Sequence, residues 1–320
     1  MVTNWLAELD GRRVTVEVPA SSANLGAGYD CLGVALGLTN RVEVEVRGWS
    51  RGQIELTIDG EGAEELPADR TNRVVMGIEA ALREVRGGIP EGVGWRIEMQ
   101  NEIPLARGLG SSAAATIAGL VAGNTLLGEP LTQADLLRFA TGIEGHPDNA
   151  TAALLGGFTA CAMVDGTVET VRFDAPRDLR AVLFIPDLRL STADMRAALP
   201  SSVPLADAVA NLARVAMGVA GMATGRADLL RILSVDRLHQ PYRSAVYPQL
   251  PRLVDAAREA GAIGACLSGA GSTILAFSDS VQTITRIEAA MSAAAADTDL
   301  AGHLTVVSPR NLGARVTASA

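Results

Sequence analysis

The sequence contains no lysine, and all 27 of its basic residues are arginine. A phosphate loop of the G-x-x-x-x-G-K-[ST] type is therefore excluded, because that loop needs the lysine ammonium to reach the β- and γ-phosphates. Catalysis through a lysine Schiff base is excluded for the same reason. If this protein binds a polyphosphate, it does so without an ammonium side chain.

Cysteine is also scarce, with thiols only at Cys31, Cys161 and Cys266. Three widely spaced cysteines fit reduced structural thiols better than a disulfide framework or a zinc site. The net charge of −9 argues against nucleic acid or an anionic membrane as the main partner. No apolar run approaches the roughly 18–20 residues of a spanning helix, and residues 1–13 lack the pattern of an export signal. These absences predict a cytoplasmic enzyme.

The hydrophobic pattern predicts an α+β protein of two domains. Hydrophobic residues make up 48% of the 320 positions, which is enough for a sizeable core, and domains average about 150 residues. Segment 19–36 is rich in small residues and is interpreted as a loop leading into an apolar stretch. Alternation and helical spacing in the first half predict strands at 14–18, 41–47, 53–59, 94–100 and 156–164, and helices at 71–85, 111–127 and 132–145.

The pattern restarts in the second half of the chain. The stretch at 174–178 contains proline and aspartate and is the best candidate boundary, which divides the chain into domains 1–175 and 176–320. Beyond it we expect strands at 180–186 and 303–308, helices near 206–224, 227–238, 248–260 and 280–295, and a strand–turn–strand unit at 262–277.

A glycine-rich turn leads into a predicted helix in the stretch PLARGLGSSAAA, residues 104–115. The first N–H groups of a helix have no intrahelical partner and carry the positive end of its dipole, so an anion is stabilised there. Gly108 and Gly110 let the backbone approach a ligand closely. Ser111 and Ser112 can cap the helix or face a magnesium ion. The alternative from these residues alone is a capped helix without a ligand.

The whole string resembles the phosphate-binding motif of the galactokinase–homoserine kinase–mevalonate kinase–phosphomevalonate kinase (GHMP) superfamily, which binds ATP without such a lysine. VEVPASSANLGAGYDCLGVAL resembles the first motif of that superfamily, and CLSGAGSTILAF resembles its C-terminal glycine-rich motif. EGHPDNATAALLGGF, STADMRAALP and DRLHQPYR resemble blocks of its homoserine kinase branch. The resemblance implies a two-domain fold, with an N-terminal domain similar to domain 2 of ribosomal protein S5 and a ferredoxin-like C-terminal domain.

The resemblance also implies ATP and Mg²⁺ as cofactors. Ser112 and Glu144 would hold the metal, because Mg²⁺ prefers oxygen ligands. Several relatives carry another acidic residue upstream in the same helix, where this chain has Arg138 and Gly142. The nucleotide would be bound by Asn72 and by Pro104, Leu105, Ala106, Arg107, Gly108, Leu109, Gly110, Ser111, Ser112, Ala113 and Ala114.

The implied reaction is the phosphorylation of L-homoserine in threonine synthesis, by a homodimer with no nucleic-acid or membrane partner. Asp30 would take the ammonium group of the substrate. Arg196 and Arg243 would bind its carboxylate, since a guanidinium binds a carboxylate in bidentate fashion. The full set of implied substrate contacts is Asn24, Asp30, His146, Asn149, Arg196, Arg243 and Gly269, and the implied catalytic residues are Asp30, Asn149 and Glu144.

A general base is missing at the expected position, because Asn149 stands where mevalonate kinase-like relatives carry aspartate. An amide does not accept a proton near neutral pH, so we expect direct attack by the substrate hydroxyl, with Asp148 as the competing base. Ser272 replaces the usual proline and is predicted to loosen its turn slightly. Two alternatives are another small-alcohol kinase, such as a mevalonate-type one, and a silent nucleotide- or amino-acid-binding sensor, which the missing upstream acids favour.

Overall fold

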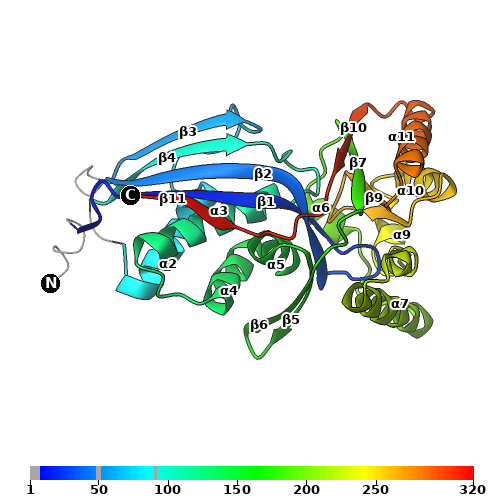
Figure 1. Cartoon of the computed structure of the whole chain (residues 1–320), viewed down its shortest axis with the longest axis horizontal. Helices are drawn as coiled ribbons and strands as arrows, with labels where there is room; N and C mark the ends of the chain where they lie inside the picture. The colour runs from blue at the N-terminus through cyan, green and yellow to red at the C-terminus, as the bar shows by residue number, and fades with distance from the viewer. Residues whose placement is uncertain (1–7, 48–51, 90–91) are drawn as a thin grey trace.

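Two β-sheets, each covered by helices, lie at opposite ends of the protein (Figure 1). The structure is a computed structural model that describes residues 8–47, 52–89 and 92–320. The first sheet has seven strands and the second has four. Helices α2 to α5 lie beneath the first sheet in Figure 1, and α10 and α11 cover the second. This arrangement confirms the predicted two-domain α+β fold.

Long antiparallel strands form the centre of the first sheet, in which β1 pairs with β2 and β2 with β4. The strand order is β11-β1-β2-β4-β3, with β5 beside the start of β2 and β6 beside β5. Val14, Val16 and Val18 of β1 are buried at alternate positions, as the period of two predicted. The strands are β1 (Arg13–Ala23), β2 (Leu32–Arg47), β3 (Ile54–Gly60), β4 (Gly94–Asn101), β5 (Phe158–Val164), β6 (Thr167–Phe173) and β11 (Arg315–Ser319).

The helices of the first half begin at distinct kinds of cap. Asn72 caps the first, and Thr132 and Asp135 form a reciprocal capping box at the third, which satisfies N–H groups that have no partner in the helix. The second helix has Gly110 before it and no side-chain cap. These helices are α2 (Arg73–Arg86), α3 (Ser111–Leu126), α4 (Gln133–Glu144) and α5 (Asp148–Leu155).

Two glycines allow α2 and α3 to pack backbone against backbone. A Cβ at Gly119 of α3 would lie 2.0 Å from the carbonyl oxygen of Val74 in α2. A Cβ at Gly77 of α2 would lie 2.5 Å from the carbonyl oxygen of Thr116 in α3. Neither contact leaves room for a methyl group, so glycine at both positions fixes the separation of the two helices.

The second half of the chain builds the smaller sheet, with strand order β10-β7-β9-β8. Its strands are β7 (Arg180–Pro186), β8 (Gly264–Leu267), β9 (Ile274–Ser278) and β10 (Gly302–Val307). Its helices are α6 (Thr192–Ala197), α7 (Leu205–Thr224), α8 (Leu230–Leu233), α9 (Gln240–Arg243), α10 (Leu250–Glu259) and α11 (Val281–Ala296). A second apolar core, with Tyr247 at its centre, lies between this sheet and its helices.

Several predicted elements differ in the structure. Residues 19–23 continue β1 rather than forming a loop, and Ala20 and Ala23 pair with Leu36 and Gly33 of β2. They are buried on both faces, so the alternation of a half-exposed strand is absent. The helix predicted at 227–238 is a short 3₁₀ turn followed by α8, which ends at Leu233. Helices α5, α6 and α9 and strands β6 and β11 were not predicted.

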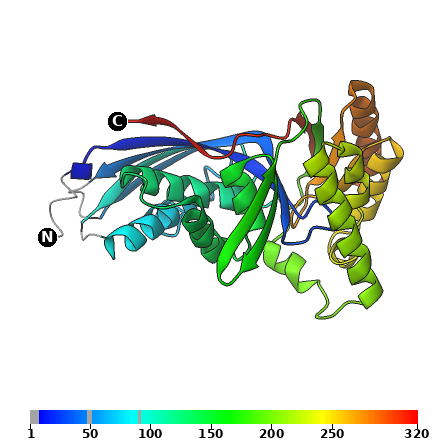
Figure 2. The same cartoon turned by 60° about the horizontal axis from the view of Figure 1, so that its bottom comes forward.

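The last strand returns to the first sheet. In Figure 2, β11 runs back along β1, and Val316 and Arg315 pair with Val16 and Glu17. The predicted boundary between residues 175 and 176 lies between β6 and β7. That boundary stays a prediction, and residues 315–319 pack with the strands on its N-terminal side.

The expectation that no apolar run reaches the length of a membrane span was wrong for α7. Its 20 residues have a mean hydropathy of 1.2, so α7 passes a test of length and composition. Leu205 and Leu212 are exposed on it, and only 17% of its apolar window is buried. A single helix of this kind is weak evidence for a membrane segment.

Gly142 offers a test of local stability in α4. It lies inside the helix, and a Cβ added there would meet nothing within 4 Å. We expect Gly142→Ala to raise the free energy of unfolding by about 0.5–1 kcal/mol, because alanine loses less conformational entropy in a helix. Denaturant titration measures this change.

Gly145 provides the matched control. It also faces open space, but its φ is +85°, so Gly145→Ala should lower stability by about 1–2 kcal/mol. Equal effects of the two substitutions would contradict this account of the end of α4.

Candidate active site

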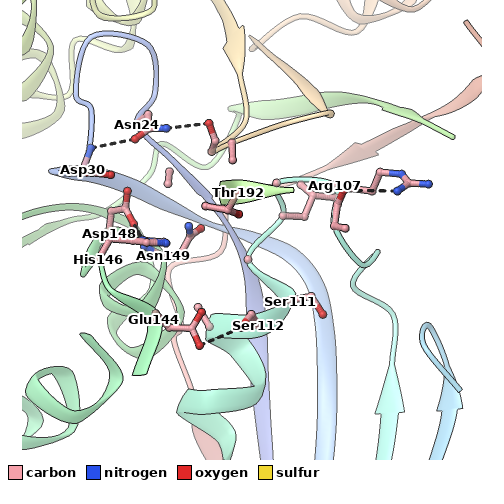
Figure 3. Close-up of a pocket in the computed structure, with 18 of the residues that line it drawn as sticks. Asn24, Asp30, Arg107, Ser111, Ser112, Glu144, His146, Asp148, Asn149 and Thr192 are labelled. Carbon is pink, nitrogen blue, oxygen red and sulfur yellow. Dashed lines mark hydrogen bonds and ion pairs between the residues drawn. The ribbon is translucent and has the colours of Figure 1, made fainter. Parts of the chain in front are cut away.

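Most of the residues singled out from the sequence line one pocket between the two sheets (Figure 3). Asn72 and Leu105 line a neighbouring pocket instead, and Ala114 lines neither. The loop between β1 and β2, the turn before α3, the α4–α5 connection, α6, α9 and the turn after β8 all contribute to its lining. Of the predicted site residues, the structure places these on the lining: Asn24, Asp30, Pro104, Ala106, Arg107, Gly108, Leu109, Gly110, Ser111, Ser112, Ala113, Glu144, His146, Asn149, Arg196, Arg243 and Gly269.

The start of α3 presents backbone N–H groups to this pocket. Gly110 precedes the helix with a φ of +72°, and no side chain caps its first turn. The idea that Ser111 or Ser112 caps the helix is therefore wrong. Uncapped N–H groups at the positive end of a helix form a binding site for an anion. The local geometry therefore suits a phosphate group.

Two glycines press the turn before α3 against neighbouring chain. A Cβ at Gly108 would lie 2.1 Å from the carbonyl oxygen of Ser268, and one at Gly110 would lie 2.1 Å from Ser21 Oγ. Both glycines have positive φ, +73° and +72°. The hydroxyl of Ser268 donates a hydrogen bond of 2.7 Å to the carbonyl of Gly108. The turn before α3 and the turn after β8 therefore form one continuous wall of the pocket.

Glu144, the last residue of α4, lies beside the first turn of α3. Ser112 Oγ and Thr116 Oγ1 donate hydrogen bonds to Glu144 Oε1 over 3.0 and 2.7 Å, and Arg73 Nε lies 3.8 Å from the same oxygen. No group of three or more His, Cys, Asp or Glu side chains with metal-binding geometry is found in the described residues. One carboxylate and one hydroxyl fit Mg²⁺, which usually completes its octahedron with water and substrate phosphates.

Two side chains assigned to the nucleotide have their polar groups bound elsewhere. The guanidinium of Arg107 donates to the carbonyls of Pro186 and Asp187 over 2.5 and 2.9 Å, and it points away from Ser111 and Ser112 in Figure 3. Asn72 Oδ1 accepts from the Val74 N–H, while Nδ2 donates to the Pro67 carbonyl. Arg107 thus joins the two halves of the chain, and Asn72 holds the start of α2.

A second, largely apolar pocket adjoins the first beside α2 and β4. The two pockets share Ala106, Ser111 and Ser112, so they form a continuous path around the start of α3. The apolar members of the second pocket are Leu66, Pro67, Met99, Leu105, Ala106 and Ala115. A flat apolar group attached to a phosphate chain fits this combination.

The loop between β1 and β2 carries Asn24 and Asp30, both with left-handed backbone (φ of +69° and +55°). Asn24 Nδ2 donates to the Gly269 carbonyl over 2.9 Å, and Asn24 Oδ1 accepts from the Asp30 N–H over 3.0 Å. This single side chain therefore fixes the loop to the turn after β8 and orients Asp30 (Figure 3).

Asp30 and Arg196 form a bidentate ion pair, with distances of 2.7 and 2.9 Å. The hydrogen bond to Asp30 raises the pKa of Arg196 further above its usual value. Arg196 also donates to the hydroxyl of Tyr29 over 2.7 Å. Asp30 and Arg196 were expected at opposite ends of a substrate, whereas in the structure the two side chains bind one another.

Arg243 differs from Arg196, because no carboxylate pairs with it in the part of the chain that the structure describes. Its side chain is 1% exposed, and it donates to Gly269 O over 2.9 Å and to Met195 O over 3.3 Å. Burial lowers the pKa of Arg243 from its usual value. A buried cation without a counter-ion is costly, so the pocket is suited to an anionic group at this point.

The α4–α5 connection and the start of α5 supply three polar side chains. His146 Nδ1 lies 2.7 Å from Asp148 Oδ1, and this hydrogen bond raises the pKa of His146 above its usual value. Asp148 Oδ1 also accepts from the Asn149 N–H over 2.7 Å. Asn149 Oδ1 accepts from Ser21 Oγ over 2.9 Å, so its Nδ2 group is the part left for a ligand.

Sequence reasoning missed Tyr29 and Thr192 at this site. Thr192 lines the pocket from the start of α6. The Tyr29 ring lies 5.4 Å from the Arg243 guanidinium carbon and 5.5 Å from that of Arg196. Two features of the sequence could have indicated them: Tyr29 directly precedes Asp30, and Thr192 lies within STADMRAALP. Ser272, predicted to loosen its turn, is buried and donates a hydrogen bond to the Leu188 carbonyl; the looser turn stays a prediction.

Comparison with known proteins agrees with this geometry. The family model described as GHMP kinases N terminal domain matches residues 72–157, and the one described as GHMP kinases C terminal matches residues 219–297. Homoserine kinase of Moorella thermoacetica is 42% identical over 301 residues, 94% of this chain and 99% of that protein. Homoserine kinase of Corynebacterium aurimucosum is 44% identical over 272 residues, 83% of this chain and 86% of that protein.

Solved structures give the same answer for the fold. A crystal structure of homoserine kinase from Cytophaga hutchinsonii has a TM-score of 0.84 and 32% identity, covering 95% of this chain and 97% of that one. The L. major mevalonate kinase in complex with R-mevalonate has a TM-score of 0.61 at 15% identity, covering 93% and 95%. The second likeness concerns the fold alone.

Proposed function

Because the chain belongs to the GHMP kinase family, we propose that it transfers the γ-phosphoryl group of ATP to the side-chain hydroxyl of L-homoserine. The product is O-phospho-L-homoserine, an intermediate on the way to threonine. The relatives named above as homoserine kinases, which match over most of their length, support this substrate. We also propose, from the resemblance, that the enzyme is a cytoplasmic homodimer.

The observation that carries the substrate assignment is the buried Arg243 without a carboxylate partner among the described residues. The carboxylate of an amino acid would neutralise it, and a guanidinium binds such a group well. Asp30, which lines the same pocket, retains lone pairs for the substrate ammonium beside Arg196. Galactose and other neutral sugars would leave Arg243 unpaired.

The triphosphate would lie along the N–H groups at the start of α3, with the adenine in the adjoining apolar pocket. Ser112 and Glu144 would hold Mg²⁺, which neutralises charge on the phosphates when bound. The chain then supplies mainly position. Asp30 and Arg243 fix the amino-acid end of the substrate, and Asn149 Nδ2 donates to the reacting end.

In the chemical step, the homoserine hydroxyl oxygen forms a bond to the γ-phosphorus as the bond between that phosphorus and the β,γ-bridging oxygen breaks. ADP leaves, and the hydroxyl proton passes to a phosphate oxygen or to water. No residue is required as a base, since phosphoryl transfer depends chiefly on alignment and charge neutralisation. Asn149 cannot accept the proton, and Asp148 Oδ1 already accepts hydrogen bonds from His146 and Asn149.

Replacing Asp148 with asparagine tests this mechanism. We expect the single-turnover rate constant to fall by less than about ten-fold, well short of the roughly 10²–10⁴-fold contribution of a general base. Quenched-flow measurement at saturating ATP and homoserine gives this constant. A loss of a thousand-fold or more with binding intact would make Asp148 the base and would overturn direct attack.

The function itself is tested by ADP release from ATP and Mg²⁺ with homoserine, mevalonate, galactose and serine as acceptors. We expect release above background with homoserine and little with the others. Preference for mevalonate would favour the other small-alcohol kinases. Tight nucleotide binding without turnover on any acceptor would favour a sensor.

A further inference from the structure

His239 is a buried residue to which the proposed mechanism assigns no role. It precedes α9 as its N-cap and is 0% exposed. Its Nε2 lies 2.7 Å from the Gly26 carbonyl oxygen, and its Nδ1 lies 3.0 Å from Arg243 Nη1. The ring stacks, tilted by 34°, on Tyr29 at 5.2 Å between centroids. It therefore contacts both Arg243 and the loop that carries Asp30.

The groups that face the two ring nitrogens fix its protonation state. Besides the Gly26 carbonyl, Nε2 faces Asp236 Oδ2 at 3.5 Å, which also can only accept a hydrogen bond. The Gly26 carbonyl can only accept a hydrogen bond, so Nε2 must carry the proton. The Arg243 guanidinium can only donate, so Nδ1 must offer its lone pair. Only the neutral Nε2–H tautomer satisfies both contacts. Burial acts in the same direction, because it lowers the pKa of His239 below its usual value.

A second set of contacts fixes His239 itself. Asp236 accepts from the backbone N–H groups of Leu238, His239 and Gln240 over 2.8, 2.9 and 2.6 Å. Asn211 of α7 donates to Asp236 over 2.7 Å and to the Ala27 carbonyl over 3.2 Å. These hydrogen bonds hold the backbone at the start of α9 beside residues 26–27.

The contacts of Arg243 leave one nitrogen for a ligand. Nε donates to Met195 O, and Nη1 donates to Gly269 O and His239 Nδ1. Nη2 donates no hydrogen bond to the part of the chain that the structure describes. His239 thus holds the guanidinium plane together with the carbonyls of Met195 and Gly269, and the orientation of that plane decides where Nη2 points.

We propose that neutral His239 is a positioning residue for the carboxylate of the substrate: it orients Arg243 and couples it to the loop that carries Asp30. The inference rests on the proposed function, because it takes the ligand of Arg243 to be the homoserine carboxylate. His239 does not touch the substrate. It acts through Arg243, and its effect is on recognition rather than on phosphoryl transfer.

Two substitutions at His239 test this role in the full chain. His239→Leu removes both hydrogen bonds, and we expect the KM for homoserine to rise ten-fold or more while kcat and the KM for ATP change less than about three-fold. His239→Gln keeps an N–H donor and a C=O acceptor at similar separation, so it should restore most of the affinity. If the leucine variant does not fold, the comparison of His239→Gln with His239→Ala serves the same purpose.

A substrate without the carboxylate separates positioning from a general structural role. 2-Amino-1,4-butanediol replaces that group with a hydroxymethyl group, so its kcat/KM should be nearly the same for wild type and His239→Leu. General damage to the loop that carries Asp30 would instead lower kcat/KM equally for homoserine and for 2-amino-1,4-butanediol. In a variant that already carries Arg243→Gln, His239→Leu should raise the KM for homoserine little further, because the effects of two coupled residues are not additive.

The outcomes distinguish this inference from the proposed function. Wild type that phosphorylates homoserine, with an unchanged homoserine KM in His239→Leu, overturns the positioning role alone. The positioning role is also overturned if His239→Leu lowers kcat/KM equally for homoserine and 2-amino-1,4-butanediol. It is overturned as well if the effects of His239→Leu and Arg243→Gln on homoserine are additive in the double variant. Wild type that does not phosphorylate homoserine overturns both.

Discussion

Replacing Glu144 with glutamine is expected to lower kcat by about a hundred- to a thousand-fold, which is the scale for removing one charged group that stabilises a phosphoryl transition state. Glu144 is the carboxylate that contacts the first two turns of α3, through Ser112 and Thr116. Glutamine is nearly isosteric and keeps those hydrogen bonds, but it removes the charge that would hold Mg²⁺. The apparent affinity for Mg²⁺ in a steady-state assay should fall with kcat.

Two further variants sharpen this result. Glu144→Asp keeps the charge on a shorter side chain, so its kcat should lie between those of wild type and Glu144→Gln. Glu84→Gln is the matched control, because Glu84 lies on the surface of α2 in an ion pair with Arg138 and outside the pocket. A Glu144→Gln variant with kcat within three-fold of wild type at saturating Mg²⁺ would remove Glu144 from the metal site.

Gly108→Ala is expected to raise the KM for ATP at least ten-fold and to lower the free energy of unfolding by 2 kcal/mol or more. Alanine at a φ of +73° costs about 1–2 kcal/mol. Its Cβ would also lie 2.1 Å from the Ser268 carbonyl and 2.8 Å from the Gly271 nitrogen. Both are backbone atoms, so the turn before α3 must move away from the turn after β8. Nucleotide titration and thermal unfolding measure the two effects.

Gly128→Ala separates backbone strain from the clash. Gly128 has a φ of +84°, and a Cβ there would meet nothing within 4 Å. Its substitution should cost about 1–2 kcal/mol of stability with no change in the KM for ATP. Nucleotide affinity lost equally in the two variants would show that the contact between the two turns does not shape the phosphate site.

The local geometry of the candidate phosphate site could be predicted from motifs, because its parts are close together in sequence or defined by their backbone; that phosphate binds there stays a prediction. The turn before α3 needs glycine for its conformation, and Ser112 follows it directly. Glu144 was assigned by position in the motif, and the structure places it 3.0 Å from Ser112. These contacts depend on a turn, a helix start and a helix end, which the sequence indicates.

For the candidate substrate-binding part of the pocket, the sequence predicted which residues take part but not which of them contact one another. Asp30 and Arg196 are 166 positions apart, and nothing in their local sequence indicates that they bind one another. Arg107 was assigned to phosphate because it lies in the motif, yet the carbonyls that bind it come from the end of β7. The strand at 19–23 could not be recognised either, because it is buried on both faces and lacks the alternation of a half-exposed strand. Distances between remote segments depend on packing, and that information is not present in a pattern of residues.

The close backbone contacts at Gly77 and Gly119 fix the distance between α2 and α3, and the apolar pocket proposed for the nucleotide lies at the start of both helices. Asn72 and Thr71, on one side of that pocket, precede α2, and Ser111, Ser112 and Ala115, on the other, belong to α3. A methyl group at Gly77 or Gly119 would push α2 and α3 apart without contacting a nucleotide in the pocket. Heat-sensitive forms of this kinase are therefore expected to arise from substitutions at Gly77 or Gly119 as readily as from substitutions of residues that line the pocket.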